Sequence, residues 1–565
     1  MSSKILLKQK AAVRSFFYEG SDFGTLQQHV WAVVLGLVTG LIGAGYSILL
    51  DLSLEALWKS LPEALSPHGE LGPSYIIAVC SLGALLVAVL GAVLPNPGNM
   101  DEWIDMLHKT GVYPASRLLP MLVLSFITAA TGFSVGPEAP MVVIGAVCGS
   151  VLAHFFKQST RAARILNITG AAGCLSSFFC RPLVGAFFVL EFPHRLGIQY
   201  YEALSPAILA SVVSSLVARH VHWTPFGGNY NYGKAQSTLP PTMVWLPLCV
   251  GLLASGVAIV SVLFMQSFKK MVMSLKHKIS HCTEMPWTGP FAMRLFLGVL
   301  IGLLGTIYPQ TIFWGEANLQ PALDGQRTPM YLLGNTTMLD WSVVAVGPEL
   351  GSWGALQICA AKIVAIALAA AGAFPGGIIY PFFFAGAYFG TALLGIHSVF
   401  AENAALVVIC SMAVMQAVIT KTPIASLLIL MVSASSFEIG GGVGGAQALG
   451  AMLPLLVSAM YVGLLLVHPT GIAYLKSARA RSWESEALKP DEAGALGEGG
   501  TSDSSAGSSA TSSPDPSDDE MPVARHSDRS VQREGDEPPE DGRAPAAPQR
   551  ADSPAMRSVQ GIESV

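Results

Sequence analysis

Charged side chains are scarce in this sequence. Only 12% of the residues are Asp, Glu, Lys or Arg, whereas 52% are hydrophobic, and the mean hydropathy is +0.52. About a quarter of the residues of an ordinary soluble domain are charged. This shortage excludes a soluble globular protein, so we expect most of the chain to lie in a lipid bilayer.

The sequence also lacks the residue patterns of common enzymes and metal proteins. It has no H-E-x-x-H element, and its apolar runs contain neither paired aspartates nor a Ser/His pairing. Its eight cysteines are scattered, and all but Cys282 have apolar neighbours, so we interpret them as packing residues. We therefore expect no catalytic activity, metal or cofactor, and no nucleic-acid partner.

Long apolar runs are what the sequence does contain. Between residues 28 and 475 there is room for about ten to sixteen membrane segments, and period-2 alternation typical of a membrane β-barrel is missing. The pattern predicts an all-α polytopic membrane protein. Clear examples of these runs are residues 31–57, 76–94, 245–265, 355–371 and 446–467.

Charge is divided unevenly along the chain. From Glu484 onward there are 18 acidic and 7 basic side chains, a net charge of −11. Because the whole chain has a net charge of −5, the part before Glu484 has a net charge of +6. We predict an amino-terminal segment over residues 1–27, a membrane domain over 28–480 and a disordered acidic Ser/Pro-rich tail over 481–565. Basic residues before the first apolar run and after the last predict cytoplasmic termini, with no indication of which membrane.

An internal repeat is the most informative feature. The pattern G-x3-P-x4-G-A-x2-G occurs from Gly136 and again from Gly377, so that Pro140 corresponds to Pro381, 241 residues later. Pro182 and Pro423 are also 241 residues apart. We predict two homologous repeats, at about 28–268 and 290–480, joined near 270–290.

Each repeated motif is typical of a helix beginning. Proline is favoured in the first helical turn, and glycine lets the preceding backbone turn sharply. A helix that begins inside a membrane has unpaired N–H groups and a positive dipole end, for which an anion is a suitable partner. Interrupted helices in corresponding places of two repeats form the midplane sites of transporters. The pair therefore predicts an anion site.

Two ionisable residues lie in apolar surroundings. Glu138 is inside the first motif, where a carboxylate is costly and is a functional candidate. An ionised Glu138 can occupy the anion's position, and a protonated one can leave it, so we expect a gate. Lys362 lies within another apolar run, where we expect a structural partner.

At these residues the sequence resembles the ClC family of chloride channels and anion/proton exchangers. Gly136-Pro137-Glu138-Ala139-Pro140 is similar to the family's G-[R/K]-E-G-P element, and Gly376 to Pro381 is similar to its G-G-x-F-x-P element. The resemblance implies inverted helical repeats and a homodimer with one pathway per subunit. It also implies that Glu138 gates the anion and that the anion is lined by Gly136, Pro137, Ala139, Gly377, Ile378 and Ile379.

Other family positions are altered. The filter segment aligns with Asn96-Pro97-Gly98-Asn99-Met100, so Pro97 stands where a serine is usual, and chloride is not preferred over nitrate on this basis. Tyr474 is the nearest candidate for the late filter tyrosine, although counting from Pro469 puts Gly471 there.

The run that begins at Pro182 resembles the family's P-L-A-G-x-x-F-x-x-E helix. It aligns Glu191 with a shared glutamate and Phe192 with the glutamate that carries protons in exchangers. Phenylalanine cannot carry a proton, so we expect a voltage- or pH-sensitive channel for small monovalent anions, chloride or nitrate. An anion/proton antiporter of the same fold and a non-conducting scaffold or regulator are the alternatives.

Overall fold

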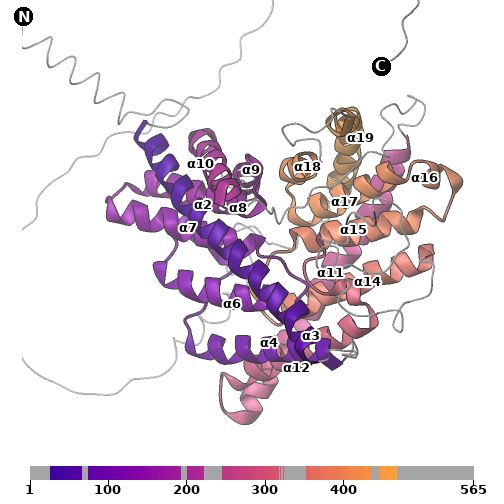
Figure 1. The fold of residues 1–565 in the computed structure, drawn as a ribbon, viewed down its shortest axis with the longest axis horizontal. Helices are drawn as coiled ribbons and strands as arrows, with labels where there is room; N and C mark the ends of the chain where they lie inside the picture. The colour runs from indigo at the N-terminus through magenta and orange to yellow at the C-terminus, as the bar shows by residue number, and fades with distance from the viewer. Residues whose placement is uncertain are drawn as a thin grey trace, which may run out of the picture. The chain divides into compact units, whose positions relative to one another are not determined.

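The computed structural model describes residues 26–65, 74–192, 200–221, 245–316, 319, 322, 351–433 and 444–467. The chain divides into two units, residues 1–495 and 496–565, and every described residue belongs to the first. Its elements (Figure 1) are α2 Leu26–Glu55, η1 Ala56–Ser60, α3 Leu61–Leu65, α4 Ser74–Val93, α5 Met100–Lys109, η2 Ala115–Arg117, α6 Leu118–Ala130, α7 Glu138–Phe155, α8 Thr160–Phe179, α9 Val184–Glu191, α10 Tyr200–Val221, α11 Trp245–Thr283, α12 Thr288–Ile307, η5 Pro309–Thr311, α14 Ser352–Ala371, α15 Ile379–Leu393, α16 Ser398–Glu402, α17 Ala404–Thr420, α18 Pro423–Val432 and α19 Gly444–Val467.

The described residues form a multi-pass helical membrane protein, as predicted. Seven of the described helical stretches are long and apolar enough to cross a bilayer, and five further apolar helices are shorter. Leucines such as Leu41, Leu216 and Leu252 are more than half exposed. An apolar exterior of this kind requires lipid as its solvent.

Helix boundaries follow the 241-residue repeat closely. The first residues of α7 and α15, Glu138 and Ile379, are 241 residues apart, and so are the last residues of α6 and α14. Helices α8 and α17 both end before a left-handed residue, Cys180 in one and Lys421 in the other. Matching helix ends at one offset mean that the two halves share a local structure.

The packing partners of the helices repeat as well. Helix α7 packs on α8 as α15 packs on α17, and α8 packs on α9 as α17 packs on α18. Helix α2 packs on α8 and α10, and α11 packs on α17 and α19. Helix α11 is therefore the counterpart of α2 and begins the second repeat.

This correspondence moves the expected join between the repeats. The motifs placed it near 270–290, but the 39-residue helix α11 runs without a break from Trp245 to Thr283. The second repeat thus starts at Trp245, after α10 ends at Val221. The motifs missed this because they sample only the later part of each half.

Corresponding elements also contact each other. Helix α4 packs on α12, α9 packs on α18, and Gly136 forms an antiparallel bridge with Gly377. Reciprocal contacts between equivalent parts are the mark of a two-fold axis. The two repeats are inverted about this axis, and the bridge lies on it.

Candidate anion site

The site is built around the bridge between the two repeats. The N–H of Gly136 donates to the carbonyl of Gly377 at 2.9 Å, and the N–H of Gly377 donates back to the carbonyl of Gly136. Helix α7 begins two residues after Gly136, and α15 begins two residues after Gly377. The bridge therefore brings the amino-terminal ends of two helices, distant in sequence, to one place.

The carboxylate of Glu138 lies between these helix ends. Its side chain is only 1% exposed, and Oε1 accepts a hydrogen bond of 3.2 Å from the backbone N–H of Tyr380 in the first turn of α15. The backbone N–H of Glu138 itself, in the first turn of α7, also stabilises the carboxylate. Amides from both repeats thus surround one anionic group.

Both bridging glycines leave space for this carboxylate. A Cβ atom on Gly136 or on Gly377 would lie 2.2 Å from Oε2 of Glu138. Neither glycine has a positive φ angle. The sequence argument assigned these glycines to a sharp turn, whereas the structure uses them for close approach of the carboxylate to the backbone.

The prolines occupy the first turns of the two helices. Pro140 and Pro381 are each the third residue of their helix, α7 and α15 respectively. Backbone N–H groups in a first turn have no partner within the helix, so a proline there removes no helical hydrogen bond. The amides that precede each proline are left to bind an anion.

Lys362 supplies a positive charge close to this carboxylate. It lies on α14, has an exposure of 0%, and donates to the carbonyls of Thr311 at 3.0 Å and Phe313 at 2.6 Å. Its ammonium group is 4.8 Å from the centre of the Phe384 ring, and its charge interacts with that of Glu138. Among the described residues it has no carboxylate within 4 Å, so its charge is balanced only by dipoles, a ring and the more distant Glu138.

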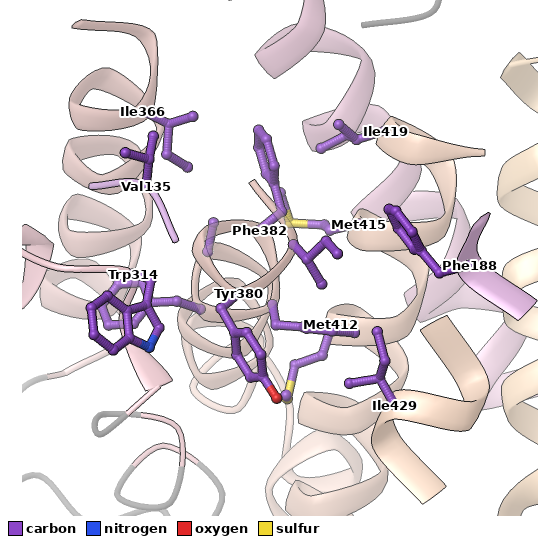
Figure 2. Packing of buried hydrophobic residues seen from close by; sticks show 14 of the residues in the cluster. Val135, Phe188, Trp314, Ile366, Tyr380, Phe382, Met412, Met415, Ile419 and Ile429 are labelled. Carbon is purple, nitrogen blue, oxygen red and sulfur yellow. The ribbon is translucent and has the colours of Figure 1, made fainter. Parts of the chain in front are cut away.

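Apolar side chains surround the first turn of α15. In Figure 2, Tyr380 and Phe382 of α15 lie among buried apolar side chains of other helices, among them Met415 of α17 and Phe188 of α9. The rings of Phe188 and Phe192 stack with their centres 5.4 Å apart. This apolar packing lies between the start of α15 and the end of α9.

Glu191 is the last residue of α9 and binds the start of α18. Its Oε1 accepts from the N–H of Ile424 at 2.9 Å, and its Oε2 accepts from the N–H of Ala425 at 2.8 Å. Both amides are in the first turn of α18, where they have no helical partner. Glu191 therefore joins the two repeats as a helix cap.

The predicted filter segment precedes α5. Gly98 has a φ angle of +79°, which explains why a glycine is required there, and its closest side chains are Tyr113 and Glu102. Asn99 caps α5 by accepting from the N–H of Glu102 at 2.9 Å. Pro97 and Gly98 are partly exposed.

A buried polar network holds α5 in place. Trp103 of α5 donates to Oδ1 of Asn167 at 2.9 Å, and Nδ2 of Asn167 donates to Ser150 at 2.8 Å. Ser150 also accepts from the N–H of Tyr113 at 2.8 Å. Helices α5, α7 and α8 are therefore tied together behind the filter segment.

Comparison with known proteins identifies the family. The model of the voltage gated chloride channel family matches residues 82–453, which is more than half of the chain. The chain belongs to this family. The predicted ClC resemblance is thereby confirmed, and the chain is a member of a family of anion channels and transporters.

Named ClC relatives are distant in sequence. The chloride channel protein CLC-f of Arabidopsis thaliana is 25% identical over 75% of this chain, which spans 54% of that protein's length. A chloride/fluoride channel protein of Pseudomonas syringae pv. tomato is 24% identical, with 64% of this chain and 71% of the relative covered.

Solved ClC structures share the fold. A slow cyanobacterial Cl−/H+ antiporter matches with a TM-score of 0.62 at 19% identity, covering 82% of this chain and 99% of that one. A CLC-type fluoride/proton antiporter matches with a TM-score of 0.57 at 19% identity, covering 80% of this chain and 98% of that one. At these identities the likeness concerns the ClC fold alone.

The structure brings together part of the predicted ClC site. Gly136, Pro137 and Ala139 lie at the start of α7, while Gly377, Ile378 and Ile379 lie at the start of α15. Pro97, Gly98, Glu191 and Phe192 lie on other elements, as described above. Tyr474, Gly471 and the predicted tail fall outside the described residues. The roles assigned to these positions remain predictions.

Sequence reasoning missed the backbone N–H of Tyr380. The family pattern directed attention to Ile378 and Ile379, two residues and one residue earlier, whereas the bond to Glu138 comes from the second residue of α15. It also missed Tyr113, whose side chain is 2% exposed and whose hydroxyl lies against Gly98. Only the loss of the usual filter serine at Pro97 hinted that another hydroxyl was relevant.

Proposed function

We propose that this protein is a gated, passive channel for small monovalent anions such as chloride. In this proposal the carboxylate of Glu138 occupies an anion position between α7 and α15 and closes the pathway. Protonation of the carboxyl removes its charge and frees the amides of the two helix ends. An anion from solution then takes its place.

The hydrogen bond from the Tyr380 N–H to Glu138 is the observation that carries this proposal. It joins a carboxylate of one repeat to a helix end of the other, in a site that water does not reach. A charge there is costly unless dipoles or opposite charges compensate for it. Amides that stabilise a buried carboxylate can stabilise a chloride or nitrate ion by the same physics, and Lys362 adds a positive charge.

Passive conduction is favoured over proton exchange by the residues near α9. Phe192 replaces the family's proton-carrying glutamate, and Glu191 uses both carboxylate oxygens to cap α18. Phe188, Met415 and Ile419 belong to the same buried apolar cluster as Tyr380, and none of these three side chains carries a proton.

Reversal potentials in liposomes test the mechanism. Purified protein is reconstituted with a chloride gradient and, separately, with an added pH gradient. A passive channel gives a reversal potential set by chloride alone. A reversal potential that shifts with the pH gradient would instead establish the antiporter and reject the channel.

A flux assay tests whether the protein transports anions at all. Chloride efflux from proteoliposomes is compared with efflux from protein-free liposomes, and the assay is repeated with nitrate, bromide and fluoride. Efflux above the protein-free rate supports transport, and the order of rates gives the selectivity. Efflux equal to the protein-free rate for all four anions would favour the scaffold alternative.

A further inference from the structure

Two cations converge on the carboxyl-terminal end of α14. Nζ of Lys276, from α11, donates to the carbonyl of Ala371 at 2.8 Å. Nε of Arg294, from α12, is 3.4 Å from the carbonyl of Gly372. Ala371 is the last residue of α14, and Gly377 of the bridge follows five residues after Gly372.

The equivalent end of α6 has neutral partners. Ala130 and Thr131 precede Ala371 and Gly372 by 241 residues. The carbonyl of Ala130 accepts from Nε1 of Trp58 at 2.8 Å, and the carbonyl of Thr131 is 3.4 Å from Sγ of Cys80. The same two backbone positions are thus capped by an indole and a thiol in one repeat, and by two cations in the other.

The residues that supply these caps are themselves related by the repeat. Helices α4 and α12 each have 20 residues, and Cys80 and Arg294 are both the seventh. Trp58 and Lys276 come from the carboxyl-terminal part of α2–η1 and of its counterpart α11. The difference between the repeats is therefore a replacement of neutral groups by charged ones that come from corresponding helices.

The described residues place no neutralising carboxylate beside either cation. Within the described ranges, Lys276 and Arg294 have no acidic oxygen within 4 Å, and both are partly exposed. Their charges interact with each other and with Lys269. The end of a helix carries about half a negative charge, so two full positive charges exceed what the cap requires.

We propose that Lys276 and Arg294 form an anion-recruiting site at one mouth of the pathway, whereas the described residues at the equivalent end of α6 form no such site. The proposal rests on the proposed anion transport. Because the repeats are inverted, the end of α14 and the equivalent end of α6 face opposite sides of the membrane. Uncompensated positive charge raises the local concentration of small anions, and dissolved salt screens the effect.

Sided anion uptake tests the proposal. Right-side-out and inside-out vesicles from expressing cells each present one face of every copy, and initial chloride uptake is measured against chloride concentration at low ionic strength. A membrane-impermeant maleimide that reacts with Cys282, which is exposed at the end of α11, identifies the vesicles with the α11–α12 hairpin outside. Cys249 is replaced by alanine throughout, because it is exposed as well.

We expect the half-saturating chloride concentration to be lower in vesicles with the hairpin outside. In K276Q/R294Q it should rise there by roughly threefold to tenfold and remain unchanged in the opposite vesicles. The charge-conserving variant K276R/R294K should restore the wild-type value. K270Q, which removes an exposed charge from the same helix, is the matched control and should have no effect.

Equal half-saturating concentrations in the two wild-type vesicle types would overturn the proposal. An equal effect of K276Q/R294Q on both faces, or an effect of K270Q as large as that of the double variant, would also overturn it. Absence of any protein-dependent uptake would instead reject the proposed transport itself, so the two failures are distinguishable.

Discussion

At the scale of single residues, the central event is the close approach of one carboxylate to two glycines. The Glu138 side chain fits only because Gly136 and Gly377 present hydrogen atoms where other residues have a Cβ. Its charge is held by amides from two helices, in the manner of a bound anion. Substitutions that remove the charge of Glu138 and substitutions that fill the space beside its carboxylate should therefore have different effects on chloride flux.

Glu138→Gln tests whether the negative charge of Glu138 closes the pathway. A neutral amide of the same shape imitates the protonated acid, so we expect chloride flux that is high and independent of pH. Wild-type flux should rise as the pH falls, by up to about tenfold per pH unit in the range where the carboxyl takes up its proton. The measurement is efflux from proteoliposomes between pH 5 and 8. E202Q, which alters a partly exposed carboxylate paired with Arg161, should keep the wild-type profile; an unchanged profile in E138Q would contradict the gate.

Gly377→Ala tests whether the Glu138 carboxylate needs the space that the glycine leaves beside it. The added methyl group would overlap Oε2 of Glu138, and the flexible carboxylate is the group that can move. We expect flux at neutral pH to rise toward that of E138Q, and G377A to have no further effect in an E138A background. G256A is the matched control, because a Cβ there meets no atom within 4 Å. Additive effects of G377A and E138A on flux would show that the two residues act separately.

At the scale of helices, buried polar side chains join elements that the hydrophobic pattern alone leaves unspecified. Glu191 connects α9 to α18 across the two-fold axis, and Asn167 connects α8 to α5 and α7. Each occupies a site where the loss of one partner leaves buried donors unpaired. Their removal should alter stability more than selectivity.

Glu191→Gln separates capping from proton transfer. The amide oxygen can still accept one of the two N–H groups at the start of α18, so we expect flux and a chloride-determined reversal potential to persist. Glu191→Ala leaves both amides unpaired and should lower the free energy of unfolding by about 1–3 kcal/mol. Thermal unfolding in detergent and reversal potentials check the pair. A pH-dependent reversal potential in the wild type that disappears in E191Q would assign Glu191 to proton transfer.

Asn167→Ala tests the network behind the filter segment. Trp103 loses its acceptor, and Ser150 loses a donor, in a fully buried place. We expect the free energy of unfolding to fall by about 1–3 kcal/mol. Asn99→Ala removes an exposed cap of the same α5 and should cost about 1 kcal/mol. A smaller loss in N167A than in N99A, measured by thermal unfolding, would contradict the assigned role.

The helices were predictable to the extent that local patterns determine them. Apolar runs gave the membrane helices, and the 241-residue offset gave the starts of α7 and α15, because proline and glycine act within one turn. Pairing of Gly136 with Gly377 was not predictable, since a sequence offset does not tell whether equivalent residues meet. The assignment of α11 to the second repeat was also missed, because the motifs sample only the later part of each half and do not show the packing partners of the helix.

At the scale of the whole molecule, the described helices belong to the unit that ends at Ala495. The net charge of the chain changes sign near the same place, because the excess of acidic side chains begins at Glu484. Folding of the membrane helices depends on apolar contacts and lipid, to which Ser/Pro-rich acidic sequence contributes little. Transport should therefore be independent of the last part of the chain.

A variant that ends at Ala495 tests this independence. We expect the same thermal unfolding midpoint in detergent as for the full chain, and the same chloride flux per protein in liposomes. The full-length protein purified in parallel is the control, and size-exclusion chromatography of both also checks the predicted homodimer. A large loss of flux in a well-folded truncated protein would assign the acidic segment a part in transport.

The bridge between Gly136 and Gly377 also has a consequence for biosynthesis. The two halves of the candidate anion site are synthesised 241 residues apart, so a ribosome that has completed α7 has produced the Glu138 carboxylate without the Tyr380 amide that binds it. Until α15 is inserted, Glu138 must stay protonated or remain in water. Two separately translated pieces, divided between Val221 and Trp245, would each contain one complete repeat, and their reassembly in a membrane would restore transport that neither piece possesses alone.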